Sequence, residues 1–310
     1  MNTKVIILLA LFTFSFSAPQ DIDYSLTSSD FSGCSQSKSP IDISYYVPEH
    51  LDFPAYPKFV LNNTFYTPIN NLKFEYLNSD DSKLPKDNTA NPYSYLGMNV
   101  TGFGSAFFLY LNKTVTYDLK ELRLHVYSEH TFEGHKMDLE LQLVHQLNQD
   151  RTEESIRDSS EVNQLLTMSV LFSIARDKKS KFIEDILEED EDKTDERFRY
   201  SFALVKSLDL NQFFNFHEPY YLYEGSGTTP FDCSKNMRWL INKKVEYLSE
   251  KQMRRIQIAM MEFKVDTNDN QIKYQHYPNG NSKIVVSPVS FDSSPRITYV
   301  ENTDRDGDDV

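Results

Sequence analysis

The stretch LRLHVYSEHTFEGHKMDLELQLVH, residues 122–145, alternates between apolar and polar side chains at both ends and is interrupted in the middle. Such alternation is typical of β-strands, whose successive side chains point to opposite faces. It places Arg123 and His125 on one face of a first strand, and Glu140, Gln142 and Val144 on one face of a second. The pattern therefore predicts two strands that, as neighbours, line one cavity with these five side chains.

Short alternating runs rich in aromatic residues recur along the chain, which contains 22 Phe and 19 Tyr. They are KFVLNNTFY (58–66), LKFEYL (72–77), AFFLYLNKTVTY (106–117) and IKYQHY (272–277). Aromatic and β-branched residues favour strands. No internal repeat or linker divides the 310 residues. The sequence predicts a single, mainly β domain with short peripheral helices.

Helical patterns are few. One candidate surrounds Glu161–Met168, and the best is SEKQMRRIQIAM at 249–260, where Ser249 and Gln252 form the sequence pattern of a capping box. The acidic segment EDILEEDEDKTDE at 184–196 reads as a solvated loop. Whether that segment is a contact surface or a solubilising insertion stays open.

The first residues, MNTKVIILLALFTFSFSAPQ, have the three parts of a secretory signal. Lys4 is followed by an apolar run of about ten residues and then by small side chains. We expect a signal peptide over residues 1–17 and a secreted protein, with a buried N-terminal helix or a signal anchor as the alternative. No other stretch approaches the roughly 20 apolar residues that span a bilayer, so no membrane span is expected.

Charge and cysteine content restrict the partners and the compartment. The formal net charge of −14 disfavours nucleic acids, anionic membranes and sulfated sugars. Two cysteines, Cys34 and Cys233, suggest one disulfide in a secreted chain, although free buried cysteines are also common. Sequons at Asn62, Asn99 and Asn112 predict N-glycosylation.

Four segments occur in an order that points to a known family. They are CSQSKSPIDI (34–43), SEHTFEGHKMDLELQLVH (128–145), YYLYEGSGTTPFDC (220–233) and MRWLINKKVEYLSEKQMRRIQ (237–257). Together they resemble the α-class carbonic anhydrases over residues 22–288, which leaves 289–310 as an acidic C-terminal tail. The resemblance implies a large twisted, mostly antiparallel sheet with an active site in a cone at its centre. It also implies a Cys34–Cys233 disulfide.

Carbonic anhydrases bind zinc through three neutral imidazoles, and the metal lowers the pKa of a bound water to about 7. The resemblance places these ligands at Arg123, His125 and Gln142. An arginine has no lone pair to give, and a carboxamide is a poor zinc ligand, so only His125 remains. We therefore expect no zinc and no other cofactor. The alternative is a relocated metal site built from the nearby histidines His130, His135 and His145.

Other parts of the family's site are retained. The resemblance assigns Glu129 and Thr228, followed by Thr229, to the side chains that orient the zinc-bound hydroxide. It assigns His130 and Glu140 to a hydrogen-bonded pair beside the metal. The proton-shuttle histidine of the family is absent.

Loss of the metal would leave two buried carboxylates, Glu129 and Glu140, without their cation, which is costly unless they find partners. We hypothesise that the guanidinium of Arg123 occupies part of the metal's space and pairs with one of them. The alternative is that Arg123 extends along the cone to water.

These residues predict a secreted, non-catalytic relative of carbonic anhydrase that serves as a binding or structural module for an extracellular protein or matrix partner. The alternative is a carbonate dehydratase, catalysing reversible CO2 hydration, with an altered zinc site. A metal-free esterase using Ser226 or Thr228 is a third reading. Function depends on the site rather than on the fold alone. Arg123 and Gln142 stand where zinc ligands are needed, so they favour the first interpretation.

Overall fold

A computed structural model describes residues 39–43, 59–77, 95–157, 159, 162–194, 199–214, 218–228, 236–261 and 298–300 of the chain. All of them lie within one unit, Gly33–Val310. The expected signal peptide, both cysteines and Thr229 lie outside the described residues, so their predictions stay predictions.

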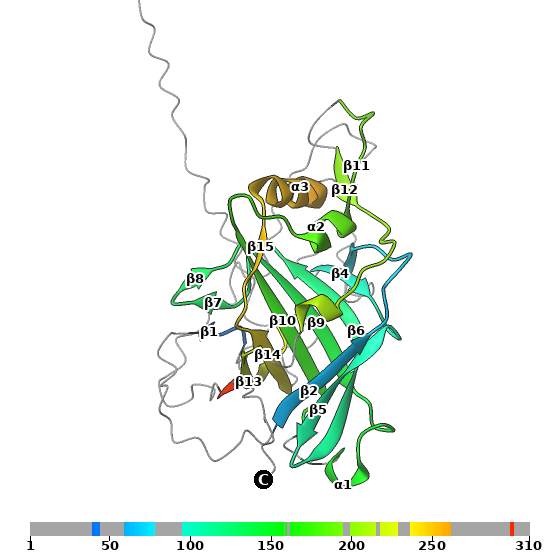
Figure 1. The fold of residues 1–310 in the computed structure, drawn as a ribbon, viewed down its shortest axis with the longest axis vertical. Coiled ribbons are helices and arrows are strands. Elements are labelled where there is room, and N and C mark those ends of the chain that lie inside the picture. The colour runs from blue at the N-terminus through cyan, green and yellow to red at the C-terminus, as the bar shows by residue number, and fades with distance from the viewer. Residues whose placement is uncertain are drawn as a thin grey trace, which may run out of the picture. The chain divides into compact units, whose positions relative to one another are not determined.

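One large curled sheet of eleven strands dominates the described residues (Figure 1). Its main path runs β16 (Thr298–Val300), β13 (Tyr220–Ser226), β14 (Asn236–Asn242), β10 (Leu165–Ile174), β9 (Leu139–Leu147), β6 (Lys113–His125), β4 (Tyr95–Asn99) and β3 (Glu75–Leu77). β15 (Glu246–Leu248) pairs with β10, β5 (Gly104–Tyr110) pairs with β6, and β2 (Phe59–Tyr66) pairs with β5. β10 runs parallel to β14 and β15, and the other pairs in this sheet are antiparallel. The predicted mainly β, mostly antiparallel class is therefore confirmed.

Smaller elements surround this sheet. β1 (Asp42–Ile43), β7 (Thr131–Phe132) and β8 (His135–Lys136) form one small sheet, and β11 (Leu187–Glu189) pairs with β12 (Tyr200–Phe202). The helices are α1 (Glu154–Arg157), α2 (Lys181–Ile186), α3 (Glu250–Met261) and the 3-10 turn η3 (Asn211–Phe213). Figure 1 shows α2, α3 and the β11–β12 pair gathered at one end of the large sheet.

The register of β6 against β9 confirms the expected neighbours. Arg123 lies opposite Gln142, and His125 lies opposite Glu140. Because side chains alternate, the leucines between them, Leu122, Leu124, Leu141 and Leu143, point to the other face and join the main hydrophobic core. The sheet therefore separates an apolar core from a polar face that carries the candidate site.

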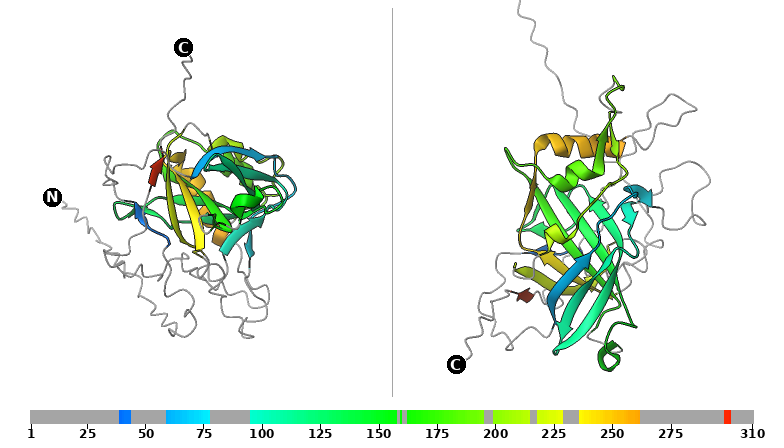
Figure 2. Two further views of the ribbon diagram at one scale, coloured as in Figure 1. Left: turned by 90° about the horizontal axis from the view of Figure 1, so that it is seen from below. Right: turned by 45° about the vertical axis from the view of Figure 1, so that its right-hand side comes forward.

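The sheet curls until β2 lies beside β13 and β14, as the view from below shows (Figure 2, left). The amide of Leu61 donates to the hydroxyl of Tyr220 at 2.9 Å, and the guanidinium of Arg238 stacks 4.1 Å from the ring centroid of Phe59. No ladder joins β2 to β13 or β14 among the described residues, so side chains make this contact.

Two local expectations were wrong. The helix expected around Glu161–Met168 is instead the start of β10, whose residues 166–172 are all buried. An interior strand, covered on both faces, reads as a continuous apolar run and is easily mistaken for a helix. The acidic segment 184–196 is also no simple loop, since it begins in α2 and β11, with Ile186 and Leu187 buried.

The helix expected at 249–260 is confirmed as α3. Ser249 Oγ accepts from the amide of Gln252 at 3.2 Å, and Gln252 Oε1 accepts from the amide of Ser249 at 3.0 Å, which is the expected capping box. In the described ranges, no helix has both the length and the apolar character that a bilayer crossing requires. Within the expected tail, Thr298–Val300 forms β16 and pairs with β13.

Candidate functional site

Glu140 is the centre of the polar face. It lies on β9, is fully buried, and accepts hydrogen bonds from the backbone amides of Glu129 and His130 at 2.7 and 3.0 Å. Its other oxygen lies 2.6 Å from the hydroxyl of Ser169 and 2.8 Å from His130 Nδ1. The carboxylate therefore ties the turn after β6 to the middle of the sheet.

Gln142 joins the two glutamates. Its Nε2 donates to Glu129 Oε2 at 2.7 Å and to Glu140 Oε1 at 3.1 Å, and all three side chains are buried. An amide has two N–H donors, and both are used here. The opposite orientation would place the amide oxygen against two carboxylates, so the hydrogen-bond network itself assigns this one.

Arg123 does not pair with the carboxylates that we expected. Its Nη2 lies 3.3 Å from Glu121 Oε2, two residues earlier on the same face of β6, and its side chain is only 7% exposed. The expected ion pair with Glu129 or Glu140 was wrong, because Gln142 already lies between those two carboxylates. The alternative, in which Arg123 extends to water, is also wrong, because the side chain is buried.

His125 and Thr228 have atoms that no described residue satisfies. His125 Nδ1 lies 3.6 Å from Glu129 Oε1, while its Nε2 is buried without a hydrogen-bond partner. Thr228 Oγ1 is also buried without one, so the pairing with Glu129 that the resemblance implied is not formed. Among the described residues, the Ser226 hydroxyl donates to the carbonyl of Gly227 rather than to a histidine, which gives the esterase reading no support there.

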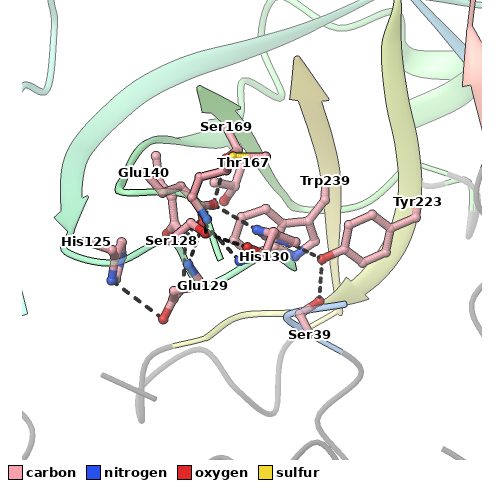
Figure 3. Close-up of polar contacts among 12 residues, drawn as sticks. Ser39, His125, Ser128, Glu129, His130, Glu140, Thr167, Ser169, Tyr223 and Trp239 are labelled. Atoms are coloured by element: carbon pink, nitrogen blue, oxygen red, sulfur yellow. Dashed lines mark hydrogen bonds and ion pairs between the residues drawn. The ribbon is translucent and has the colours of Figure 1, made fainter. Parts of the chain in front are cut away.

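A hydrogen-bonded chain leads away from Glu140 (Figure 3). Beyond His130, the hydroxyl of Tyr223 lies 2.8 Å from Nε2 and 3.0 Å from Ser39 Oγ. The ring of Trp239 packs against His130 with centroids 4.8 Å apart. β9, β13 and β14 and the segment before β1 are thereby held together around one buried imidazole.

Electrostatics keep this centre ionised. Burial by itself raises the pKa of Glu140, but the charge and hydrogen bond of His130, the charge of His125 and the hydroxyl of Ser169 hold it well below its ordinary value. Burial also raises the pKa of Tyr223 well above its ordinary value, so its hydroxyl keeps its proton.

The donor chemistry does not fit zinc. Of the three positions that the resemblance assigns to zinc ligands, Arg123 offers no lone pair, and Gln142 turns N–H donors toward the carboxylates. His125 is the single remaining imidazole. Among the described residues, no three His, Cys, Asp or Glu side chains are grouped as a metal site would require.

The nearby histidines His130, His135 and His145, all within the described residues, do not gather as a metal site would require. His135 is exposed in β8. His145 is buried on the core side of β9, where its Nδ1 lies 2.8 Å from the carbonyl of Leu143 and its Nε2 lies 2.9 Å from the Tyr66 hydroxyl. In the described structure, the relocated metal site therefore does not assemble.

Four contributors were not found from the sequence. Ser39, Glu121, Ser169 and Tyr223 all make contacts in the site. Glu121 carried a usable signal, because it lies on the same face of β6 as Arg123 by the alternation already recognised. Ser169 belongs to the strand that was mistaken for part of a helix, and the other two depend on long-range contacts.

Comparison with known proteins identifies the family. The model of the eukaryotic-type carbonic anhydrase family matches residues 28–277. This chain belongs to the eukaryotic-type carbonic anhydrase family, whose enzymes depend on zinc.

Similar sequences include one protein named as a carbonic anhydrase and one named as a dioscorin. "Alpha carbonic anhydrase 7" of Arabidopsis thaliana is 28% identical over 159 residues, covering 50% of this chain and 48% of that protein. "Dioscorin dioA3" of Dioscorea japonica is 30% identical over 159 residues, covering 51% and 52%. The match thus spans about half the length of these relatives. A crystal structure of dioscorin complexed with ascorbate has a TM-score of 0.51 at 21% identity, covers 89% of this chain and 91% of that chain, and shows the same fold.

Proposed function

We propose that this chain is a secreted carbonic-anhydrase-like protein without catalytic activity, used as an extracellular binding or structural module. The observation that carries the proposal is the contact of Gln142 with both Glu129 and Glu140. A third imidazole would have to occupy that position to complete a zinc site. Catalysis in this family needs a water activated by zinc. The residues at the proposed ligand positions do not form a site that would hold that zinc.

Surface features support the extracellular part of the proposal. Asn62, Asn99 and Asn112 are all exposed, as glycosylation requires. The N-terminal sequence has a secretory pattern, and we propose that Cys34 and Cys233 form the family's disulfide in the oxidising compartment. The partner is proposed to be a protein or matrix component, because the acidic charge disfavours nucleic acids and anionic membranes.

The first test uses the purified mature protein. We expect zinc well below one ion per chain by elemental analysis, and CO2 hydration no faster than buffer, because one imidazole and a carboxamide bind zinc weakly. One zinc per chain together with CO2 hydration would instead establish the carbonate dehydratase and overturn the proposal.

The second test restores the ligands. The double variant Arg123→His with Gln142→His places three imidazoles next to Glu129 and Glu140, so it should bind zinc stoichiometrically. Activity is expected to return only in part, because other side chains around the site have changed. A folded double variant that binds no zinc would show that these positions do not converge on one site.

A further inference from the structure

Gln142 makes specific hydrogen bonds with both glutamates of the site. The amide nitrogen lies between Glu129 Oε2 and Glu140 Oε1, at 2.7 and 3.1 Å, in a place where Glu129 is 4% exposed and the other two residues are fully buried. Buried carboxylates that lack donors or a cation are strongly destabilising. One side chain therefore donates hydrogen bonds to both buried carboxylates, and it is the described side chain that bridges Glu129 and Glu140.

The other polar side chains near Glu129 and Glu140 do not bridge these two carboxylates as Gln142 does. Arg123, the fixed cation on the same face, is engaged with Glu121. His125 lies 3.6 Å from Glu129 Oε1, beyond hydrogen-bond distance. Glu140 has several other donors, whereas Gln142 is the side chain that links it to Glu129.

We infer that Gln142 is a positioning residue that replaces the cation of this site, holding Glu129 and Glu140 together through its amide and making the fold independent of bound metal. This inference rests on the proposed non-catalytic function and deepens it. The amide nitrogen, rather than the absence of ligands alone, then closes the site to a cation. Exchanging that nitrogen for oxygen should create a need for metal.

The test is the substitution Gln142→Glu, which keeps the size of the side chain and exchanges two N–H donors for a third carboxylate. Its melting temperature in EDTA should fall by about 10 °C, because an uncompensated charge is buried in a large domain. Saturating zinc should restore at least half of that loss. The unmodified protein should melt at the same temperature in EDTA and in zinc.

Gln146→Glu is the matched control, because it makes the same change at an exposed position on the same strand. It should show neither the loss nor the response to zinc. Gln142→Met, which removes the donors without adding charge, should lower the melting temperature but give no zinc response. If Gln142→Glu fails to fold in EDTA, refolding with zinc should recover it.

Two outcomes overturn the inference: a Gln142→Glu variant as stable in EDTA as Gln146→Glu, or a destabilised one that zinc does not rescue. Both leave the proposed function standing when the unmodified protein is free of zinc and inactive. Stoichiometric zinc and CO2 hydration in the unmodified protein would contradict the proposed function itself, which is a separate result.

Discussion

A fully buried charge is the central feature at the residue scale. Glu140 has no exposed surface, yet five donors surround its two oxygens, from the amides of Glu129 and His130 and the side chains of His130, Gln142 and Ser169. Charge-assisted hydrogen bonds of this kind are about twice as strong as neutral ones. They offset the desolvation that would otherwise protonate the group, and they fix the chain around it.

Gly225 is predicted to tolerate no larger side chain, because Ser39 and Tyr223 lie close to its Cα. A Cβ at this position would lie 2.1 Å from Ser39 Oγ and 2.7 Å from the ring of Tyr223. Gly225→Ala should therefore push Ser39 away from Tyr223 and lower the free energy of unfolding by about 1–3 kcal/mol, as overpacking does. Urea unfolding of the variant and the unmodified protein would measure the difference.

The control for this variant is a double-mutant cycle. Ser39→Ala removes the atom nearest to the added methyl group, so the pair Ser39→Ala and Gly225→Ala should cost less than the sum of the single changes. Additive losses would mean that the methyl group of the alanine meets something other than Ser39.

Single residues also show what alternation can and cannot predict. Period-two alternation was sufficient to place Arg123 and His125 on one face, and the register then set Arg123 opposite Gln142. It could not choose the partner of Arg123, because a long side chain reaches several carboxylates on the same face. The contacts with Glu121 and between Gln142 and Glu129 depend on side-chain rotamers, which no pattern specifies.

At the scale of elements, the cap of α3 was predictable, whereas the interior strand β10 was not. The start of α3 follows from local chemistry, since Ser249 and Gln252 bond each other's backbone amides. β10 lies between β9 and β14 with both faces covered, so its sequence lacks the alternation that identifies a half-exposed strand. The secondary structure of such a segment depends on its position in the tertiary structure.

Gln252 is predicted to support two helices at once. Besides capping α3, its Oε1 accepts from the amide of Ser180, the N-cap of α2, and its Nε2 donates to Ser180 O and to Glu184. Gln252→Ala should lower the free energy of unfolding by about 2–3 kcal/mol, from a lost cap and buried groups left without partners. Chemical denaturation would measure this loss.

Gln257→Ala is the matched control, because it is the same substitution on α3 at a partly exposed position. Its effect should stay within about 0.5 kcal/mol. Equal effects at the two positions would mean that helix propensity, rather than the contacts of Gln252, determines the loss.

At the scale of the whole molecule, distant segments make the decisive contacts. Leu61 meets the hydroxyl of Tyr220 across 159 positions of sequence, and Arg238 stacks on Phe59 where the sheet curls round. The fold class could be predicted because aromatic alternation recurs along the chain. The path of the strands could not be derived from local pattern, because it depends on which distant faces pack together.

His145 makes the stability of the whole fold sensitive to mild acid. Burial is the main cause that lowers its pKa to about 4, from 6.5 for the ordinary side chain, and backbone hydrogen bonds oppose this only in part. Above pH 6.5, neither state binds the proton. Between pH 6.5 and 4 the unfolded chain binds it and the folded chain does not, so stability falls by about 3 kcal/mol as the pH falls. Below pH 4 both states are protonated, and this loss ends.

The measurement is the free energy of unfolding in urea from pH 7.5 to 4, for the unmodified protein and for His145→Gln. The variant loses the proton-binding group, so its curve should be flatter across this range, whatever its absolute stability. His135→Gln, at an exposed histidine, should keep the slope of the unmodified protein. Glu140 affects stability at lower pH. Because its pKa is lowered in the folded protein, its contribution to the free energy of unfolding is present above the ordinary pKa of a glutamate and is lost as the pH falls below that pKa. Parallel curves for His145→Gln and the unmodified protein between pH 6.5 and 4 would show that His145 is not the group responsible.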